Sequence, residues 1–487
     1  MSSSSLRILF LAAEAAPFVK TGGLADVVGA LPKALAALGH DVRVVLPAHG
    51  AIEAQVREGR GPIGVHGLTL RVPMGTGPVA AGVFESQLPR SGVPVYFVAE
   101  RHLFDRPFVY GYDDDPWRYA FYARAALDLV VAALGWRPDV VHAHDWHAAP
   151  AIYWLATAGS ADERYRGIPT VFSIHNLMHQ GRTSADLLPW LGVPDTPLAE
   201  EGWREVNLMG RALLHATMIS TVSPTYAREI LTREGGAGLD GLLRHRHFDL
   251  HGILNGIDAD HWDPAADRFL ASAFDRDTVD GRQANKRALQ ARLGLPERAD
   301  VPLVAMVSRL DAQKGFDIAG HVVHLLMNDQ AGEAQFVVLG AGAPHYEDMF
   351  RHLASYHRSK MAVVFGYHSG LASLVYGGSD VFLMPSRFEP CGLGQMMAMR
   401  YGSLPVVRAT GGLADTVQDG ISGFTFVEFR WEDLWEALRR ALYLWRFAAE
   451  SWRAMQRHAM GRDFSWAVSA RGYEQLYEWA IARQRGW

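Results

Sequence analysis

The sequence predicts an α/β protein built from two doubly wound, Rossmann-like domains that follow each other along the chain. Its 487 residues exceed what one hydrophobic core usually supports, so two large domains are expected. Short apolar runs rich in Val alternate with helical patterns, which is typical of parallel strands covered by helices on both faces. A segment at 249–264 with Gly252, Gly256 and Pro264 divides these runs into two sets and indicates a crossover between domains.

The expected strands are short buried runs. In the first domain they are ILFL, VRVVL, VYFV, DVVH, TVFSI and MISTV, which begin at residues 8, 42, 95, 139, 170 and 218. In the second domain they are LVAMVS, FVVLG, AVVFG, VFLMP and LPVV, which begin at residues 303, 336, 362, 381 and 404. The domains are therefore expected to span 1–250 and 251–463, with a helix at 464–487 that packs back on the first domain.

Composition excludes several classes of protein. A net charge of −5 without a basic stripe argues against nucleic acid as a partner. Cys391 is the only cysteine, so an intramolecular disulfide is impossible. The first apolar run ends at Glu14 and is too short for a signal peptide, and the most apolar later stretch, FYARAALDLVVAALGW, contains Arg124 and Asp128. We therefore expect a soluble, cytoplasmic protein without a membrane partner.

The hexapeptide TGGLAD occurs twice, at 21–26 and at 410–415, each time where an expected strand turns into a helix. Glycine at such a turn lets a ligand approach bare amide groups at the positive end of a helix, so a phosphate or sugar oxygen is the expected ligand. A structural helix start explains a single copy equally well. Neither copy is a Walker loop or a GxGxxG motif, which argues against a P-loop NTPase or a dinucleotide oxidoreductase. The candidate residues are Gly22, Gly23, Thr410, Gly411 and Gly412.

Lysine use points to the same two regions. The chain has 42 Arg but only five Lys, so a retained Lys indicates a place where a compact ammonium group is needed. Lys20 precedes the first glycine turn, while Arg309 and Lys314 follow the strand LVAMVS. Fixed cations of this kind suit a leaving diphosphate, whose charge grows as its bond to a sugar breaks. The alternative is a set of ordinary surface cations.

Three further motifs come directly after expected strands. HAHDWH contains Asp145 among three histidines and resembles the HxHxDH pattern of metallo-hydrolases, except that Asp is fourth rather than fifth. SIHN places His175 at another strand end, where a histidine hydrogen-bonded within the core is the alternative. SRFEPCGLGQ places Glu389 before a glycine-rich helix start. A carboxylate directed into a cleft can bind sugar hydroxyls or offset charge on an oxocarbenium-like centre.

Together these motifs resemble those of bacterial glycogen synthases and plant starch synthases, in order over nearly the whole chain. They are KTGGLADVVGALPKAL, HAHDWHAAP, SIHN, TVSPTYAREI, ILNGID, SRLDAQKG and PSRFEPCGLGQMMAMRYGSLPVVRATGGLADTV. The resemblance implies a GT-B fold with an active-site cleft between the two domains. It also implies retaining transfer of glucose from ADP-glucose to the non-reducing end of an α-1,4-glucan, without a metal or another cofactor.

The resemblance also implies roles for single residues. The catalytic group would comprise Asp145, His175, Arg309, Lys314 and Glu389, with the two cations on the diphosphate and the other side chains around glucose. Substrate would also contact Lys20, Gly22, Gly23, Tyr110, Asn255, Tyr367, Cys391, Gly392, Leu393, Gly394, Thr410, Gly411 and Gly412. Within this set, Tyr367 is the candidate neighbour of adenine.

The sequence departs from the family pattern at three positions. Gly394 stands where Thr is frequent, Met397 stands where wider retaining GT-B families have a second glutamate, and Ala343 stands where Asp is usual. Three alternatives stay open. They are a GT-B enzyme that uses UDP-glucose or a small acceptor, a catalytically silent glucan-binding protein, and a metallo-hydrolase built on HAHDWH.

Overall fold

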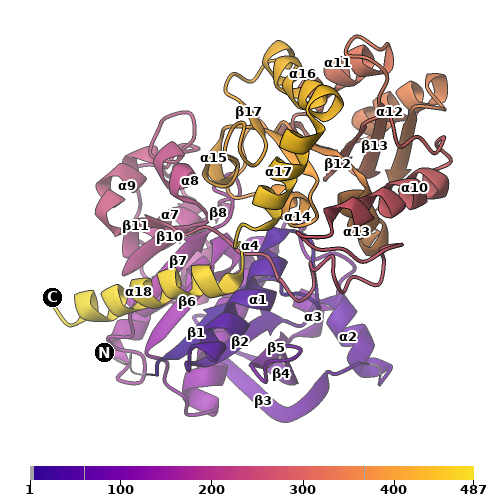
Figure 1. The fold of residues 1–487 in the computed structure, drawn as a ribbon. Helices are drawn as coiled ribbons and strands as arrows, with labels where there is room; N and C mark the ends of the chain where they lie inside the picture. Colours follow the sequence, from indigo (N-terminus) through magenta and orange to yellow (C-terminus); the bar gives the residue numbers. More distant parts are fainter. Residues whose placement is uncertain (1–4, 60, 367, 487) are drawn as a thin grey trace. The chain divides into compact units, whose positions relative to one another are not determined.

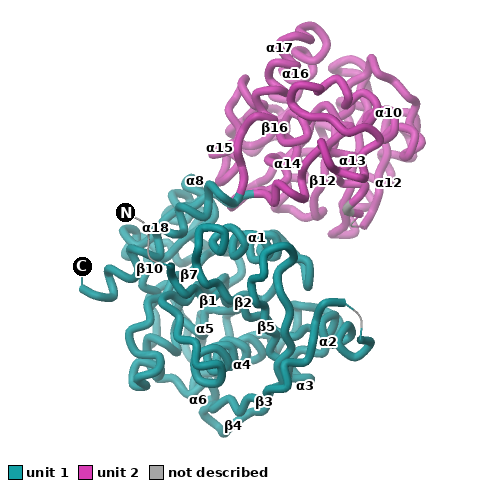
Figure 2. The backbone as a smooth tube through the Cα atoms, turned by 60° about the horizontal axis from the view of Figure 1, so that its bottom comes forward, with its two compact units in different colours: residues 1–256, 466–487 teal, residues 257–465 magenta. Residues whose placement is uncertain are grey.

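The computed structural model describes residues 5–59, 61–366 and 368–486. The chain forms two compact units (Figure 2): unit 1 comprises residues 1–256 and 466–487, and unit 2 comprises residues 257–465. Each unit is a twisted, mainly parallel sheet with helices on its faces, as the alternation of apolar runs and helical patterns predicts (Figure 1).

Unit 1 contains a nine-stranded sheet in the order β11-β10-β7-β6-β1-β2-β5-β4-β3. All neighbours pair in parallel except β3 with β4 and β4 with β5. The strands are β1 (Arg7–Leu11), β2 (Asp41–Pro47), β3 (Gly64–Met74), β4 (Gly77–Gln87), β5 (Pro94–Ala99), β6 (Val140–His144), β7 (Thr170–Ile174), β10 (Met218–Thr221) and β11 (Leu250–Gly252). A separate hairpin pairs β8 (Arg182–Ser184) with β9 (Glu205–Asn207).

The helices of unit 1 cover both faces of this sheet. They are α1 (Gly23–Ala37), α2 (Gly50–Arg57), α3 (Arg101–Phe104), α4 (Asp115–Leu127), α5 (Asp145–Ala156), α6 (Leu187–Leu191), α7 (Leu208–His215), α8 (Pro224–Glu229), α9 (Asp240–His245) and α18 (Trp466–Gln484). Helix α18 packs beside α1 and against β6, β7 and β10 (Figure 1). Phe10 of the sheet and Tyr473 and Tyr477 of α18 belong to the same buried core.

The boundary between the units differs from the predicted one. The first unit does not end at residue 250, because Leu250–Gly252 forms β11 and pairs with β10 as the last strand of the first sheet. The chain leaves unit 2 at Ser465 rather than at residue 463, because the amide of Ile257 bonds the carbonyl of Phe464 at 2.8 Å.

Unit 2 contains a six-stranded parallel sheet in the order β14-β13-β12-β15-β16-β17. The strands are β12 (Leu303–Val307), β13 (Gln335–Gly340), β14 (Met361–Phe365), β15 (Val381–Met384), β16 (Leu404–Arg408) and β17 (Phe424–Phe426). The helices are α10 (Arg282–Leu293), α11 (Phe316–Met327), α12 (Pro344–Tyr356), α13 (Ser369–Gly378), α14 (Gly394–Arg400), α15 (Gly411–Thr416), α16 (Trp431–Phe447) and α17 (Ala449–Met460). Among the described residues of both units, no helix is both long enough and apolar enough to cross a membrane.

Candidate active site

The candidate residues of unit 1 lie at the carboxyl edge of its sheet, where the strand order reverses. Strand β1 pairs with β6 on one side and with β2 on the other. Loops that leave two such strands run to opposite sides, and open α/β sheets bind their ligands at this point. Glu14 follows β1 and Asp145 follows β6, so two carboxylates are found here.

Glu14 is not among the residues that the motifs predict, although it organises the first glycine turn. Its buried carboxylate accepts hydrogen bonds from the amides of Thr21 and Gly22, the latter at 3.2 Å, and another from the hydroxyl of Tyr110. Burial raises the pKa of Glu14. The amide of Gly22, which was expected to meet a phosphate or sugar oxygen, is thus already bonded to a carboxylate of the chain. The only signal in the sequence is an acidic residue shortly after a buried strand.

The first glycine turn leaves space for an approaching group. Gly22 caps α1 and Gly23 begins it. A Cβ atom added to Gly23 would meet no heavy atom within 4 Å, and one added to Gly22 would meet only Glu14 Oε1, at 3.7 Å. Nearby, Lys20 Nζ lies 2.6 Å from Asp26 Oδ1 of the same hexapeptide. The protein itself therefore does not require these glycines for packing, which agrees with a turn that a ligand approaches.

Asp145 begins α5 in a strained conformation. Its φ of 56° is in the left-handed region, which side chains other than glycine rarely adopt. Its Oδ1 accepts the amide of His175 at 2.7 Å and lies 3.5 Å from the amide nitrogen of Asn176. Two predicted site residues, Asp145 and His175, are thus brought together through neighbouring strands. Burial raises the pKa of Asp145 to about 7, and the charge of Glu14 adds to this rise.

The histidines of HAHDWH have partners within the protein. His142 contacts the hydroxyls of Tyr477 at 2.8 Å and Ser173 at 2.6 Å. His144 Nδ1 lies 2.9 Å from Nε2 of His175. Burial lowers the pKa of His142, His144 and His175, so these three imidazoles are neutral.

The metallo-hydrolase alternative depends on these same side chains. His147 packs against the ring of Tyr110, with the ring centres 4.7 Å apart. Within residues 5–59, 61–366 and 368–486, no three His, Cys, Asp or Glu side chains are grouped so that they could hold a metal ion. The rings of the motif instead pack on one another, with ring centres 4.0 Å apart for His142 and His144 and 4.1 Å apart for Trp146 and His147.

The raised pKa of Asp145 predicts a pH dependence. An ionised carboxylate accepts hydrogen bonds from sugar hydroxyls better than a protonated one does. We therefore expect kcat/KM to increase with pH through about 7, as Asp145 loses its proton. Replacing Glu14 with Gln removes a neighbouring negative charge and lowers the pKa of Asp145, so the acid limb should shift toward lower pH. The measurement is a pH profile of kcat/KM for the donor.

Glu53 provides a matched control for this experiment. It is also a buried carboxylate of unit 1 whose pKa burial raises, but it is not among the groups that act on Asp145. Glu53→Gln should leave the acid limb unchanged. An equal shift in both variants, or no shift in Glu14→Gln, would show that the limb does not report Asp145.

The candidate residues of unit 2 centre on an ion pair with low exposure. Lys314 Nζ lies 2.6 Å from Glu389 Oε2, and the two side chains are 14% and 7% exposed. The same oxygen accepts a hydrogen bond from the hydroxyl of Ser386 at 2.9 Å. Lys314 was expected to contact a diphosphate and Glu389 to contact a sugar, whereas in this structure the two side chains form an ion pair with each other. A site that contains both can bind a negative group and a hydroxyl group side by side.

Two loops bring this pair together because their strands are neighbours. Lys314 follows β12 and Glu389 follows β15, and these strands pair in parallel. Gly315 has a φ of 75°, and an added Cβ would lie 2.8 Å from the carbonyl carbon of Pro385, so only glycine fits where the loops cross. Arg309, which also follows β12, pairs with Asp311 instead of Glu389. Its side chain is 63% exposed and lies 3.4 Å from Asp311.

The second copy of the hexapeptide differs from the first. The amide of Gly412 bonds the carbonyl of Glu389 at 3.2 Å. An added Cβ at Gly411 would lie 2.9 Å from the carbonyl carbon of Glu389, and one at Gly412 would lie 2.5 Å from Cα of Cys391. Packing therefore requires the glycines of this copy, and the expected contact of this turn with a ligand stays a prediction. Its glycines let the backbone of 410–412 pack against the loop that carries Glu389.

The remaining predicted residues lie around this loop or elsewhere. Cys391 is buried, Gly392 has a φ of 72°, Leu393 caps α14, and a Cβ on Gly394 would lie 3.2 Å from the ring of Phe382. The missing Thr hydroxyl at 394 thus coincides with a crowded position. Thr410 caps α15. In unit 1, Asn255 is buried and its Oδ1 has no hydrogen-bond partner among the described residues. Tyr367 lies outside the described residues.

Comparison with known proteins identifies relatives along the whole chain. The family described as starch synthase catalytic domain matches residues 7–245, and the family described as glycosyl transferases group 1 matches residues 290–458. Glycogen synthase from Anaeromyxobacter sp. (strain Fw109-5) is 46% identical, over 97% of this chain and 99% of that protein. Glycogen synthase from Moorella thermoacetica is 42% identical, over 99% and 98%.

Solved structures agree with these relatives. The catalytic domain of starch synthase IV from Arabidopsis thaliana, bound to ADP and acarbose, superposes with a TM-score of 0.91 at 34% identity, over 99% of this chain and 100% of that one. Sucrose-phosphate synthase from Thermosynechococcus elongatus shares the fold, with a TM-score of 0.61 at 17% identity over 98% and 100%. The expected GT-B fold class is confirmed. With relatives this similar over nearly its full length, the chain belongs to the family of bacterial glycogen synthases and plant starch synthases.

Proposed function

We propose that the chain is a glucosyltransferase of glycogen synthesis, which moves glucose from ADP-glucose to the non-reducing end of an α-1,4-glucan with retention of configuration. The observation that carries this function is the 46% identity to a glycogen synthase over 97% of the chain. The ADP and acarbose bound to the similar starch synthase structure support a nucleotide donor and a glucan acceptor.

The chemistry requires neutralisation of a leaving diphosphate. The bond between the anomeric carbon and the diphosphate oxygen breaks, and the 4-hydroxyl oxygen of the acceptor bonds to that carbon. The hydroxyl proton leaves with ADP. Lys314, with Arg309 on the same loop, stabilises the charge that grows on the diphosphate. Glu389 holds Lys314 in place and accepts glucose hydroxyls, and the ionised carboxylate of Asp145 accepts others.

Neutral imidazole suits the place beside the sugar. Burial keeps the pKa of His175 at about 3, so its ring carries no charge that would repel a positively charged transition state. His144 positions that ring through its 2.9 Å contact. The orientation of His175 is therefore supported by a second buried side chain.

The donor and the role of metal are tested in one assay. Purified protein is incubated with glycogen and either ADP-glucose or UDP-glucose, and nucleoside diphosphate release is measured. We expect ADP-glucose to be preferred and EDTA to leave the rate unchanged, because protein cations can neutralise the diphosphate. A preference for UDP-glucose would contradict the proposed donor and support the alternative of a GT-B enzyme that uses UDP-glucose. Activity that is lost with EDTA and restored by Mn²⁺ would contradict transfer without metal.

A further inference from the structure

An open cavity of about 520 Å³ lies in unit 2 beside the C-terminal half of α16. Tyr443 and Phe447 form its aromatic wall, and Phe424 and Met455 contribute to its lining. These two wall rings are one helical turn apart, with centres separated by 5.0 Å and planes inclined at 50°. Their side chains are 65% and 72% exposed, although aromatic rings are usually buried. The wall is therefore a paired aromatic platform at the surface.

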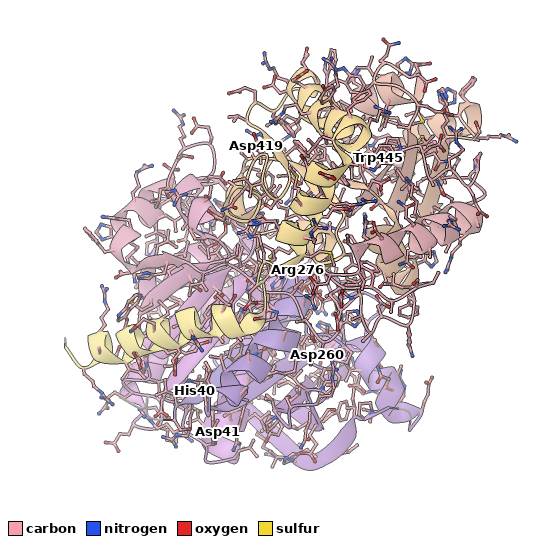
Figure 3. The ribbon with its side chains drawn as sticks, viewed as in Figure 1. His40, Asp41, Asp260, Arg276, Asp419 and Trp445 are labelled. Carbon is pink, nitrogen blue, oxygen red and sulfur yellow. The ribbon has the colours of Figure 1, made fainter. Side chains whose placement is uncertain are left out.

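Three arginines line this cavity, and two of them are paired with carboxylates. Arg440 forms a fork with Asp419, with distances of 2.9 and 3.0 Å, and Asp419 is labelled in Figure 3. Arg439 lies 3.0 Å from Glu436. An anion would have to compete with these carboxylates, whereas a neutral ligand with many hydroxyl groups can bond to paired guanidinium and carboxylate groups alike.

The helix that carries the platform is anchored to a loop that also lines the cavity. Arg446, on the same helix, donates hydrogen bonds to the carbonyls of Ala331 and Glu333, the latter at 2.7 Å. Gly332, between them, has a φ of 75°, and an added Cβ would lie 3.2 Å from the guanidinium carbon of Arg446. A helix backbone that is already anchored loses little conformational entropy when a ligand binds.

We propose that this cavity binds an α-1,4-glucan chain at a second site, separate from the residues that carry out transfer. Successive pyranose rings present apolar C–H faces that pack on aromatic rings, and their hydroxyl groups face the polar rim. The choice of ligand rests on the proposed function, since that function makes an α-1,4-glucan the acceptor. A second contact would keep a polymeric acceptor near the enzyme by raising its effective concentration.

The test compares polymeric and short acceptors in the full-length protein. In the Tyr443→Ala/Phe447→Ala double variant, glycogen binding measured by affinity electrophoresis should weaken about tenfold. KM for glycogen should rise by a similar factor, while kcat and KM for maltotriose should stay at their wild-type values. Both rings are exposed, so folding should be unaffected. Tyr356→Ala is the matched control, because this tyrosine of α12 is 72% exposed and outside the cavity lining.

The outcomes separate this site from the transfer reaction. The second site is overturned if glycogen retards the double variant as strongly as the wild-type protein. It is also overturned if Tyr356→Ala loses as much glycogen binding as the double variant. Displacement of glycogen by inorganic phosphate but not by maltoheptaose identifies an anion site and also overturns it. A third outcome is that the wild-type protein transfers no glucose, while glycogen retards the wild-type protein but does not retard the double variant. In that case the proposed function fails and the second site stands.

Discussion

Replacement of Glu389 with alanine is expected to lower kcat about 100-fold to 1,000-fold. The carboxylate is the 2.6 Å partner of Lys314, and both side chains are largely withdrawn from water. Its loss removes the acceptor for glucose hydroxyls and leaves an ammonium group without its counter-ion at a nearly buried position. We expect donor KM to change less than kcat, because the ion pair acts on charge that develops as the bond breaks. Steady-state kinetics with ADP-glucose and glycogen measures both constants.

Lys314 tests the same contact from its other end. Lys314→Ala should lower kcat by about 30-fold to 150-fold, which corresponds to one charge-assisted contact. Lys314→Arg should remain impaired, because a planar guanidinium does not match a space shaped for a single Nζ–Oε2 contact. Wild-type turnover by Lys314→Arg would make Lys314 an interchangeable cation.

An exposed ion pair in the same unit serves as the control. Lys360 Nζ lies 2.6 Å from Asp329, with side chains 21% and 48% exposed. Lys360→Ala should change kcat less than twofold or so, since exposed pairs contribute little. A thermal melt distinguishes lost catalysis from lost folding. If Glu389→Ala is unfolded at the assay temperature, Glu389 is a structural residue.

The sequence predicts the parts of this fold that depend on periodicity. All of the predicted strand runs are strands of the two sheets, because buried parallel strands require continuous apolar residues. The hairpin of β3 and β4 escapes prediction because exposed positions interrupt its buried and half-buried ones, so no continuous apolar run marks it. β11 is only three residues long and leaves too little pattern to detect.

Side-chain partners lie beyond this kind of prediction. The motifs place Lys314 and Glu389 at strand ends, but only the pairing of β12 with β15 makes those ends adjacent. Glu14 is missed because its role depends on amides that come seven and eight residues later in a turn. Asp145 was predicted from its motif, but its raised pKa follows from burial, which the motif does not encode.

The two copies of TGGLAD predict opposite results for the same substitution. Gly412→Ala places a Cβ 2.5 Å from Cα of Cys391, so the loop bearing Glu389 must move. Backbone does not yield as a flexible side chain does, and we expect a loss of about 3 kcal/mol or more in unfolding free energy and a lower melting temperature. In Gly23→Ala the added Cβ meets no heavy atom within 4 Å, and alanine favours the helix. The melting temperature should therefore be unchanged or slightly higher.

Activity assays complete this comparison. Both turns were predicted to receive a ligand, but only at the first does an added Cβ meet open space. Gly23→Ala should lower kcat/KM about tenfold or more while the protein stays folded, since a methyl group stands where substrate approaches the turn. Gly39→Ala is not a suitable control, because Gly39 has a φ of 98°, whereas Gly64 has open space and no such strain. Gly64→Ala should therefore retain both stability and activity. If Gly23→Ala is also fully active, the first turn is only a helix start, and the repeated hexapeptide has a structural role in both units.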